Sequence, residues 1–163
     1  MGKRKSGGGT PATVALDAAK IAYDIRAYEH DPSAWSYGGE AAQALGVEPE
    51  RVFKTLLAQT DIGLVVAIVP VSGTLDLKAL ATAVGVKKAS MADPLDAQRS
   101  SGYVLGGISP IGQRKPLPTV LDASAQEHAT ILVSGGRRGL DLELPPADLI
   151  AVTKGRYAAI GRL

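Results

Sequence analysis

The stretch Val-Phe-Lys-Thr-Leu-Leu-Ala-Gln-Thr-Asp-Ile-Gly-Leu-Val-Val-Ala-Ile-Val-Pro-Val, residues 52–71, decides the fold. It predicts two strands, 52–59 and 64–71, joined by a turn around Thr60-Asp61, because apolar and β-branched residues dominate both halves. The second strand has no polar face, so we expect other parts of the chain to cover both of its faces.

Short helices and strands are expected to alternate on either side of this hairpin. The helices predicted from caps and breakers lie at 10–23, 39–45, 77–84, 93–100 and directly after Pro145-Pro146. The strands predicted from alternation lie at 24–30, 103–105, 119–121, 130–134, 140–144 and 157–160. This order predicts a single compact α+β domain, 10–163, with a mixed, mostly antiparallel, barrel-like sheet surrounded by short helices. Residues 1–9 are expected to form a flexible basic tail.

The composition excludes several classes of enzyme. The chain has 163 residues, two histidines and no cysteine. A thiolate nucleophile, a thiolate zinc site and an iron–sulfur cluster are therefore impossible, as is a three-histidine metal site. We expect neither a metal nor another cofactor. The formal net charge of +2 is compatible with a nucleic-acid partner without being evidence for one.

Location is predicted from the apolar pattern. The longest apolar run, 64–71, has eight residues, whereas a membrane helix needs about 20. The N-terminus continues from Lys3-Arg4-Lys5 into Ser-Gly-Gly-Gly rather than an apolar signal region. We therefore expect a cytoplasmic protein with no membrane partner.

Lys54 is the most informative single residue. Strand alternation places its side chain on the same face as Val52, Leu56 and Ala58. An ammonium on an apolar face is costly unless it finds a partner or lines a pocket. The alternative is a lysine of an edge strand whose stem packs while its ammonium reaches water.

Two glycine-rich segments are candidate anion sites. In Gly106-Gly107-Ile108-Ser109-Pro110, free backbone N–H groups could face an anion or a developing oxyanion, and Arg114 and Lys115 follow closely. The alternative is a turn that ends a strand. The segment 134–141, Ser-Gly-Gly-Arg-Arg-Gly-Leu-Asp, could bind phosphate through Arg137 and Arg138, or form a hairpin with solvated arginines.

Tyr28 and His30 share a predicted strand face with Arg26. Tyr28 could stack on a base or donate a hydrogen bond, or simply lie at an amphipathic rim. His30 is expected to stabilise the turn at Asp31-Pro32, and His128 to be exposed. No Walker, H-E-x-x-H or G-x-S-x-G motif occurs in the sequence.

Several of these segments together resemble one known family. Tyr-Glu-His-Asp-Pro, Val-Phe-Lys-Thr-Leu-Leu, Leu-Asp-Leu-Lys and Met-Ala-Asp-Pro occur in order, followed by residues 98–115, Leu-Pro-Thr and residues 133–141. The chain from about 10 to 160 thereby resembles the YbaK family of aminoacyl-tRNA deacylases, which is related to the editing domain of bacterial prolyl-tRNA synthetase. The resemblance is closest to the branch that clears cysteine from mischarged tRNA(Pro).

The resemblance implies a trans-editing enzyme that acts on the acceptor end of an aminoacyl-tRNA beside prolyl-tRNA synthetase, with no DNA partner. The substrate's own thiol would attack its carbonyl, so the protein needs no nucleophile. Lys54 matches the family's essential lysine, and the loop from Gly106 through Pro110, with Gly107, Ile108 and Ser109, matches its G-x-x-x-P motif. Pocket positions of the family fall on Tyr28, Ser134 and Asp141. Candidates for tRNA phosphate contacts are Arg99, Arg114, Lys115, Arg137 and Arg138.

Two other functions stay open on the sequence. One is a non-catalytic module that binds tRNA ends, which the modest charge and the scarcity of acids and bases in the motifs would allow. The other is a deacylase for a different mischarged amino acid, such as alanine.

Overall fold

The hairpin at the centre of the sequence forms the middle of the largest sheet. In the computed structural model, which describes residues 9–31 and 37–162, β2 (Phe53–Thr60) and β3 (Gly63–Pro70) pair antiparallel over their whole length. Residues Val65 to Pro70 are all buried, as predicted for a strand covered on both faces. The Thr60 hydroxyl closes the turn, since it donates to the Gly63 carbonyl at 2.7 Å.

Three further strands complete this sheet. β5 (Ala89–Met91) pairs antiparallel with β2, and β6 (Thr119–Asp122) and β9 (Arg156–Ala158) add on in parallel beyond β3. The resulting five-stranded order is β5-β2-β3-β6-β9.

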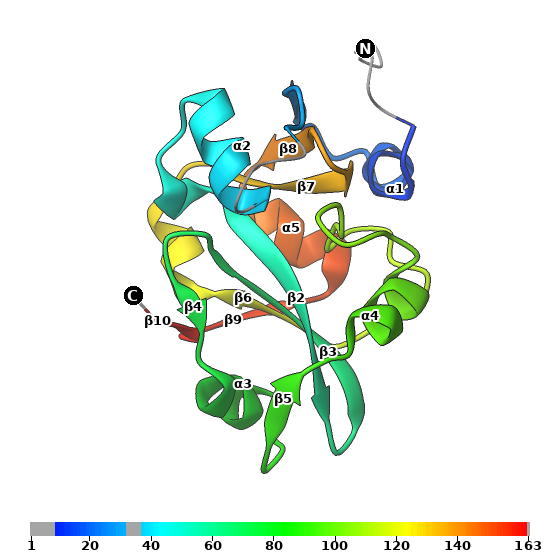
Figure 1. Ribbon diagram of the computed structural model, residues 1–163, viewed down its shortest axis with the longest axis vertical. Helices are drawn as coiled ribbons and strands as arrows, with labels where there is room; N and C mark the ends of the chain where they lie inside the picture. Colours follow the sequence, from blue (N-terminus) through cyan, green and yellow to red (C-terminus); the bar gives the residue numbers. More distant parts are fainter. Residues whose placement is uncertain (1–8, 32–36, 163) are drawn as a thin grey trace.

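A second sheet lies above the start of β2 (Figure 1). It has the order β1-β8-β7, formed antiparallel by β1 (Asp24–Ala27), β8 (Leu140–Leu144) and β7 (Ile131–Arg137). A parallel bridge between Val52 and Leu132 links it to the start of β2. A third, two-stranded sheet pairs β4 (Thr74–Leu75) with β10 (Gly161–Arg162).

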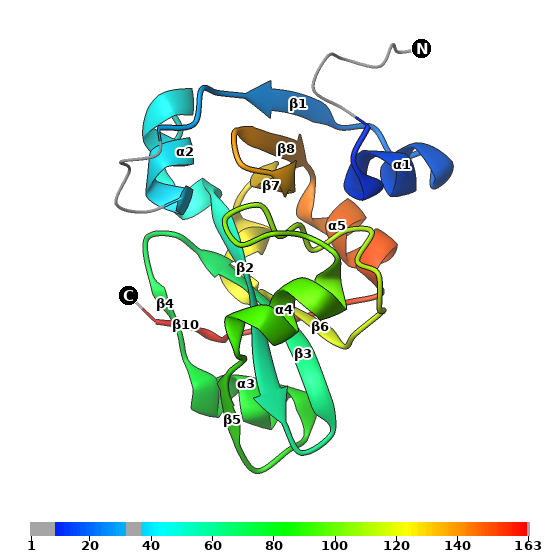
Figure 2. The same cartoon turned by 45° about the vertical axis from the view of Figure 1, so that its right-hand side comes forward.

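Short helices cover these sheets, as Figures 1 and 2 show. The α-helices in the described part of the chain are α1 (Pro11–Ala18), α2 (Tyr37–Leu45), α3 (Leu77–Val84), α4 (Pro94–Ser101) and α5 (Pro146–Thr153). The 3₁₀ turns are η1 (Pro49–Arg51) and η2 (Ala123–Glu127). The fold is thus a single compact α+β domain with mostly antiparallel sheets. In the described residues the strands fall into separate sheets rather than a closed barrel.

The core divides on the two faces of β2 and β3. Phe53, Leu57 and Ile68 face the main cluster, which also contains residues of β7, β8, α1 and α5. Ala58 and Val69 face a second cluster together with Leu80 of α3. The hairpin therefore contributes to both clusters. Each of its fully buried Val, Leu or Ile side chains adds about 1.5–3 kcal/mol to stability.

Some predicted boundaries are wrong. The predicted helix 10–23 ends at Ala18, because Lys20 adopts a left-handed φ of 59° and the Ile21 N–H turns back to the Leu16 carbonyl. The predicted strand 24–30 ends at Ala27. The three-residue strand β5 was not predicted, because it is too short to show alternation.

The predicted strand 103–105 does not form. Gly102 ends α4 with a φ of +83°, and the Leu105 N–H donates to the Gln98 side chain instead of to a neighbouring strand. Tyr103 is nevertheless buried, and its hydroxyl donates to the Ile111 carbonyl at 2.7 Å. Tyr103 therefore anchors a loop, whereas Val104 and Leu105 are exposed.

Asp122, at the end of β6, holds the C-terminal segment in place. Its carboxylate accepts the N–H groups of Ile160 and Gly161, at 2.9 and 2.7 Å, and the Ser124 hydroxyl at 2.5 Å. Asp122 is buried, so these donors replace its lost hydration.

We predict that Asp122→Ala lowers the free energy of unfolding by about 2–3 kcal/mol, because it leaves buried donors without an acceptor. Urea denaturation measures this change. The control is Asp61→Ala in the exposed β2–β3 turn, expected to stay within about 0.5 kcal/mol of wild type. Equal effects of the two variants would contradict the anchoring role of Asp122.

Candidate functional site

The three-stranded sheet has one apolar face, and its other face carries polar side chains beside the buried Leu132. The sequence Leu-Asp-Leu-Glu-Leu of β8 alternates, so its leucines are buried while Asp141 and Glu143 point to the opposite face. Ser134 of β7 and Arg26 of β1 are the register partners of Asp141. Residues paired across strands share a face, so these side chains form one polar row.

Lys54 lies on β2, near the start of β7. A parallel bridge joins Val52 to Leu132 of β7, and Lys54 lies two residues beyond Val52, on the same face of β2. The Lys54 side chain is partly buried, and no described residue forms an ion pair or hydrogen bond with its ammonium. Burial lowers the pKa of Lys54. This ammonium is therefore available to an anionic ligand.

Tyr28 adds a hydrogen-bond donor to the same face. Its N–H donates to the Gly139 carbonyl at 2.9 Å, which continues the pairing of β1 with β8. Burial, together with the negative charges of Asp141 and Glu40, raises the pKa of the Tyr28 hydroxyl to about 12. The hydroxyl therefore stays protonated at neutral pH and can donate.

Asp141 is the most perturbed acid of the site. The residue is 6% exposed. Burial raises the pKa of this carboxyl to about 7, against the lowering effect of the Arg26 charge. The group can therefore change protonation state near neutral pH, which is typical of functional carboxyls.

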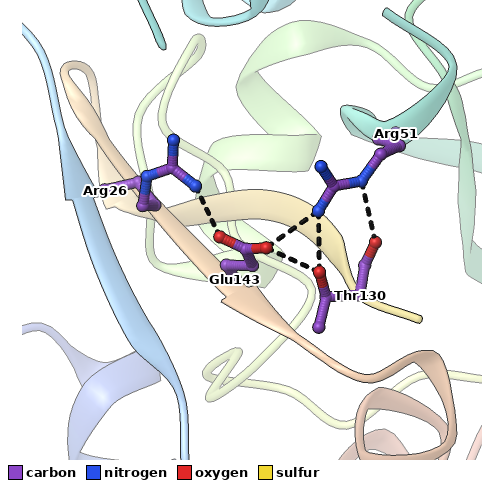
Figure 3. Close-up of polar contacts among 4 residues, drawn as sticks. All are labelled: Arg26, Arg51, Thr130 and Glu143. Carbon is purple, nitrogen blue, oxygen red and sulfur yellow. Dashed lines mark hydrogen bonds and ion pairs between the residues drawn. The ribbon is translucent and has the colours of Figure 1, made fainter. Parts of the chain in front are cut away.

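Arg26 itself belongs to a network that the motifs did not reveal (Figure 3). Its guanidinium donates to Glu143 at 2.5 Å, and Arg51 donates to the other oxygen of that carboxylate at 2.8 Å. The Thr130 hydroxyl adds a third bond at 2.6 Å. The hydrogen bond from Thr130 and the two arginines keep the pKa of Glu143 below its ordinary value. Alternation along β8 was the signal that could have placed Glu143 beside Asp141.

The first glycine-rich segment is held against the β7–β8 hairpin. A Cβ on Gly107 would lie 2.7 Å from the Arg137 Cα, so only glycine fits there. The Arg138 Nε donates to the Leu105 carbonyl at 2.9 Å. The Gly107 N–H already donates to the Val104 carbonyl at 2.9 Å. In the part of the chain that is described, the amides of Gly106 and Ile108 have no such acceptor, so an oxyanion would be bound by those.

Three other predicted substrate contacts in this segment have buried side chains. Ile108, Ser109 and Pro110 are all buried, and the Ser109 hydroxyl accepts the Ile111 N–H at 3.2 Å. Because these side chains are buried, the predicted binding role of the three residues refers to their backbone atoms and stays a prediction.

The predicted phosphate-binding residues fall into two groups. Arg137 and Arg138 are exposed at the β7–β8 hairpin, next to the glycine loop. Arg99, Arg114 and Lys115 are exposed at the other end of the loop, where 114 and 115 are hydrogen-bonded to the last turn of α4. The segment 134–139 is not a simple turn: β7 continues to Arg137 through a bulge after Ser134.

His30 takes part in the connection between β1 and α2. Its Nδ1 lies 2.9 Å from a carboxylate oxygen of Glu40. Within residues 9–31 and 37–162, no three histidine, aspartate or glutamate side chains come close enough to share a metal ion. In the same residues, no helix has the length and apolar character needed to span a membrane.

The arrangement combines a cation without a partner, a phenol donor, a hydroxyl and a buried acid with a glycine loop nearby. The sequence model of the aminoacyl-tRNA editing domain matches residues 32–152. The chain belongs to this family. The match includes Lys54, the glycine loop, Ser134 and Asp141, whereas Tyr28 lies just before it.

Relatives agree with this family assignment. The chain is 39% identical, over 98% of both chains, to EbsC of Enterococcus faecalis, a proposed Cys-tRNA(Pro)/Cys-tRNA(Cys) deacylase. A crystal structure of a proposed trans-editing enzyme for prolyl-tRNA synthetase superposes with a TM-score of 0.83 at 25% identity, covering 94% of this chain and 96% of that one. Hypothetical protein APE2540 shares the fold at 21% identity, with a TM-score of 0.83 and coverage of 93% and 99%.

We predict that Gly107→Ala lowers the free energy of unfolding by about 1–3 kcal/mol, because the new methyl group must push the loop away from the backbone of Arg137. Amide hydrogen exchange should accelerate from 104 to 109. The control is Gly85→Ala at the end of α3, where φ is +78° and space is open. It should lose stability without faster exchange in this loop, and equal exchange in both variants would contradict the contact.

We predict that Asp141→Asn makes the protein more resistant to alkaline destabilisation. The raised pKa means that the folded state retains a proton that the unfolded state releases, so wild-type stability falls as pH rises towards 7. Between pH 5.5 and 8 the wild type should lose about 2 kcal/mol that the variant retains. Urea denaturation at both pH values tests this, and parallel losses would contradict the burial of an uncompensated acid.

Proposed function

We propose that this protein is a trans-editing deacylase that releases cysteine from mischarged Cys-tRNA(Pro). The observation that carries the proposal is the relation to EbsC, which extends over nearly the whole of both chains. Membership of the aminoacyl-tRNA editing family supports a tRNA-bound ester as substrate. The proposal includes a cytoplasmic location and action beside prolyl-tRNA synthetase, as the name of one structural relative suggests for that protein.

The arrangement of the site suits an ester whose own side chain attacks. The chain contains no cysteine, so a thiol in the reaction must come from the substrate. The Lys54 ammonium would hold the terminal phosphate or sugar oxygens and so orient the ester. The unpaired amides of Gly106 and Ile108 would stabilise charge on the carbonyl oxygen as it develops.

The surface around the site offers cations for the acceptor strand. Arg137 and Arg138 are next to the glycine loop, and a second group lies at the end of α4. Contacts of this kind are independent of base sequence and weaken with salt. Selectivity for tRNA(Pro) would therefore come from the synthetase partner rather than from these cations.

The test is to incubate the full chain with tRNA(Pro) that carries cysteine, serine or alanine and to follow loss of the labelled amino acid. Cysteine should be released fastest, and serine should be nearly stable because its hydroxyl is a weaker nucleophile than a thiol. Lys54→Ala should slow release by about 100-fold or more. Lys87→Ala, an exposed lysine outside the site, is the matched control and should leave the rate unchanged.

Each alternative has its own outcome in the same experiment. Equal release of serine would rule out participation of the thiol, and preferential release of alanine would change the substrate assignment. Salt-dependent binding of tRNA without loss of any ester would indicate a non-catalytic module. Full activity of Lys54→Ala would remove Lys54 from the mechanism.

A further inference from the structure

The carboxyl of Asp141 is buried without the partners that such groups normally have. The residue as a whole is 6% exposed, and no residue in 9–31 or 37–162 donates a hydrogen bond to its side chain. Asp122 is buried to a similar degree, at 7%, yet it accepts the N–H groups of Ile160 and Gly161. Buried carboxylates are costly unless they are paired in this way. The exception at Asp141 therefore calls for a functional explanation.

The nearest cation is held by another acid. Arg26 is the register partner of Asp141, but its guanidinium donates to Glu143. Glu143 is in turn fixed by Arg51 and Thr130, so its position does not depend on Arg26 alone (Figure 3). Glu143 thereby keeps Arg26 from forming the ion pair that would hold Asp141 permanently ionised.

The other charged groups around Asp141 do not replace that pair. Just after β1, Tyr28 is a neutral phenol at neutral pH, and Glu40 of α2 acts on the same phenol with a negative charge. On β2, the Lys54 ammonium is not among the charges that shift the pKa of Asp141 in the described chain. Within the described chain, the Arg26 charge lowers the pKa of Asp141, and burial outweighs this effect.

We infer that Asp141 accepts the proton of the nucleophile in the release reaction, and that Glu143 is a positioning residue which holds Arg26 away from it. This inference rests on the proposed function. It assigns a proton transfer to a group on the same sheet face as its register partners Ser134 and Arg26, near which the ester would be bound.

The step balances without any further reactant. As the substrate sulfur bonds to the ester carbonyl carbon, the thiol proton passes to the Asp141 carboxylate. The bond from that carbon to the ribose oxygen then breaks, and the ribose oxygen takes the proton from Asp141. The products are a cyclic thioester of cysteine and the free tRNA hydroxyl, and Asp141 is a carboxylate again.

The first measurement needs no substrate. A ¹³C carboxyl NMR titration of the full chain should show Asp141 titrating near neutral pH. In Glu143→Gln, the midpoint should move to lower pH, because Arg26 loses its competing carboxylate. The inference would be overturned if Asp141 stays ionised from pH 4 to 9 in wild type, or if its midpoint does not move in Glu143→Gln. Either result would count even if the protein is active.

The second measurement is the pH dependence of cysteine release. The wild-type rate should rise with pH and level off by about pH 8, as the carboxylate form of Asp141 becomes fully populated. Asp141→Asn should be about 100-fold slower at pH 7 and should continue to rise about tenfold per pH unit, because thiolate formed in solution must then react. Asp61→Asn, in the exposed β2–β3 turn, should behave as wild type.

The two hypotheses fail in different ways. If wild type releases no cysteine, the proposed function is wrong. If wild type releases cysteine but Asp141→Asn keeps the same rate and the same levelling, the function stands and the proton-acceptor role is wrong. A slower variant with an unchanged pH profile would indicate a merely structural role and would also overturn the inference.

Discussion

The eight-residue pairing of β2 with β3 is the constraint on which the rest of the structure depends. Both faces of this hairpin are covered, so it separates the main core from the cluster under α3 and contributes to each. Its first residues also set the site, because the bridge from Val52 to Leu132 places Lys54 beside β7. A shift of one residue in this register would turn Lys54 to the opposite face.

A second constraint holds the glycine loop. Backbone contact between Gly107 and Arg137, and the bond from Arg138 to the Leu105 carbonyl, join the loop to the hairpin that carries Ser134 and Asp141. The same hairpin anchors the start of α1, because the Thr10 hydroxyl donates to the Gly135 carbonyl at 2.5 Å. Ser134, Asp141 and the glycine loop are thus held together by one supersecondary unit.

The two acids of β8 differ in how well the fold stabilises their negative charge. Glu143 is satisfied by two arginines and a hydroxyl, whereas Asp141, two residues away, is buried with a raised pKa. Functional sites commonly retain such destabilised groups, and the surrounding packing compensates for them. The difference between the two acids follows from which of them Arg26 reaches.

The sequence by itself determined the α+β class, the β2–β3 hairpin and the faces of the strands, because strand alternation and helix caps are local properties. It also singled out Lys54, as a charge on an apolar face. Alternation could show that Asp141 and Glu143 share a face, but not that Arg26 is bonded to Glu143. Only the tertiary structure decided that Asp141 is buried without donors, that the Gly107 N–H is already used, and that 103–105 is an anchored loop. The physical reason is that burial, hydrogen-bond competition and close backbone approach depend on segments far apart in the chain, and no local pattern records them.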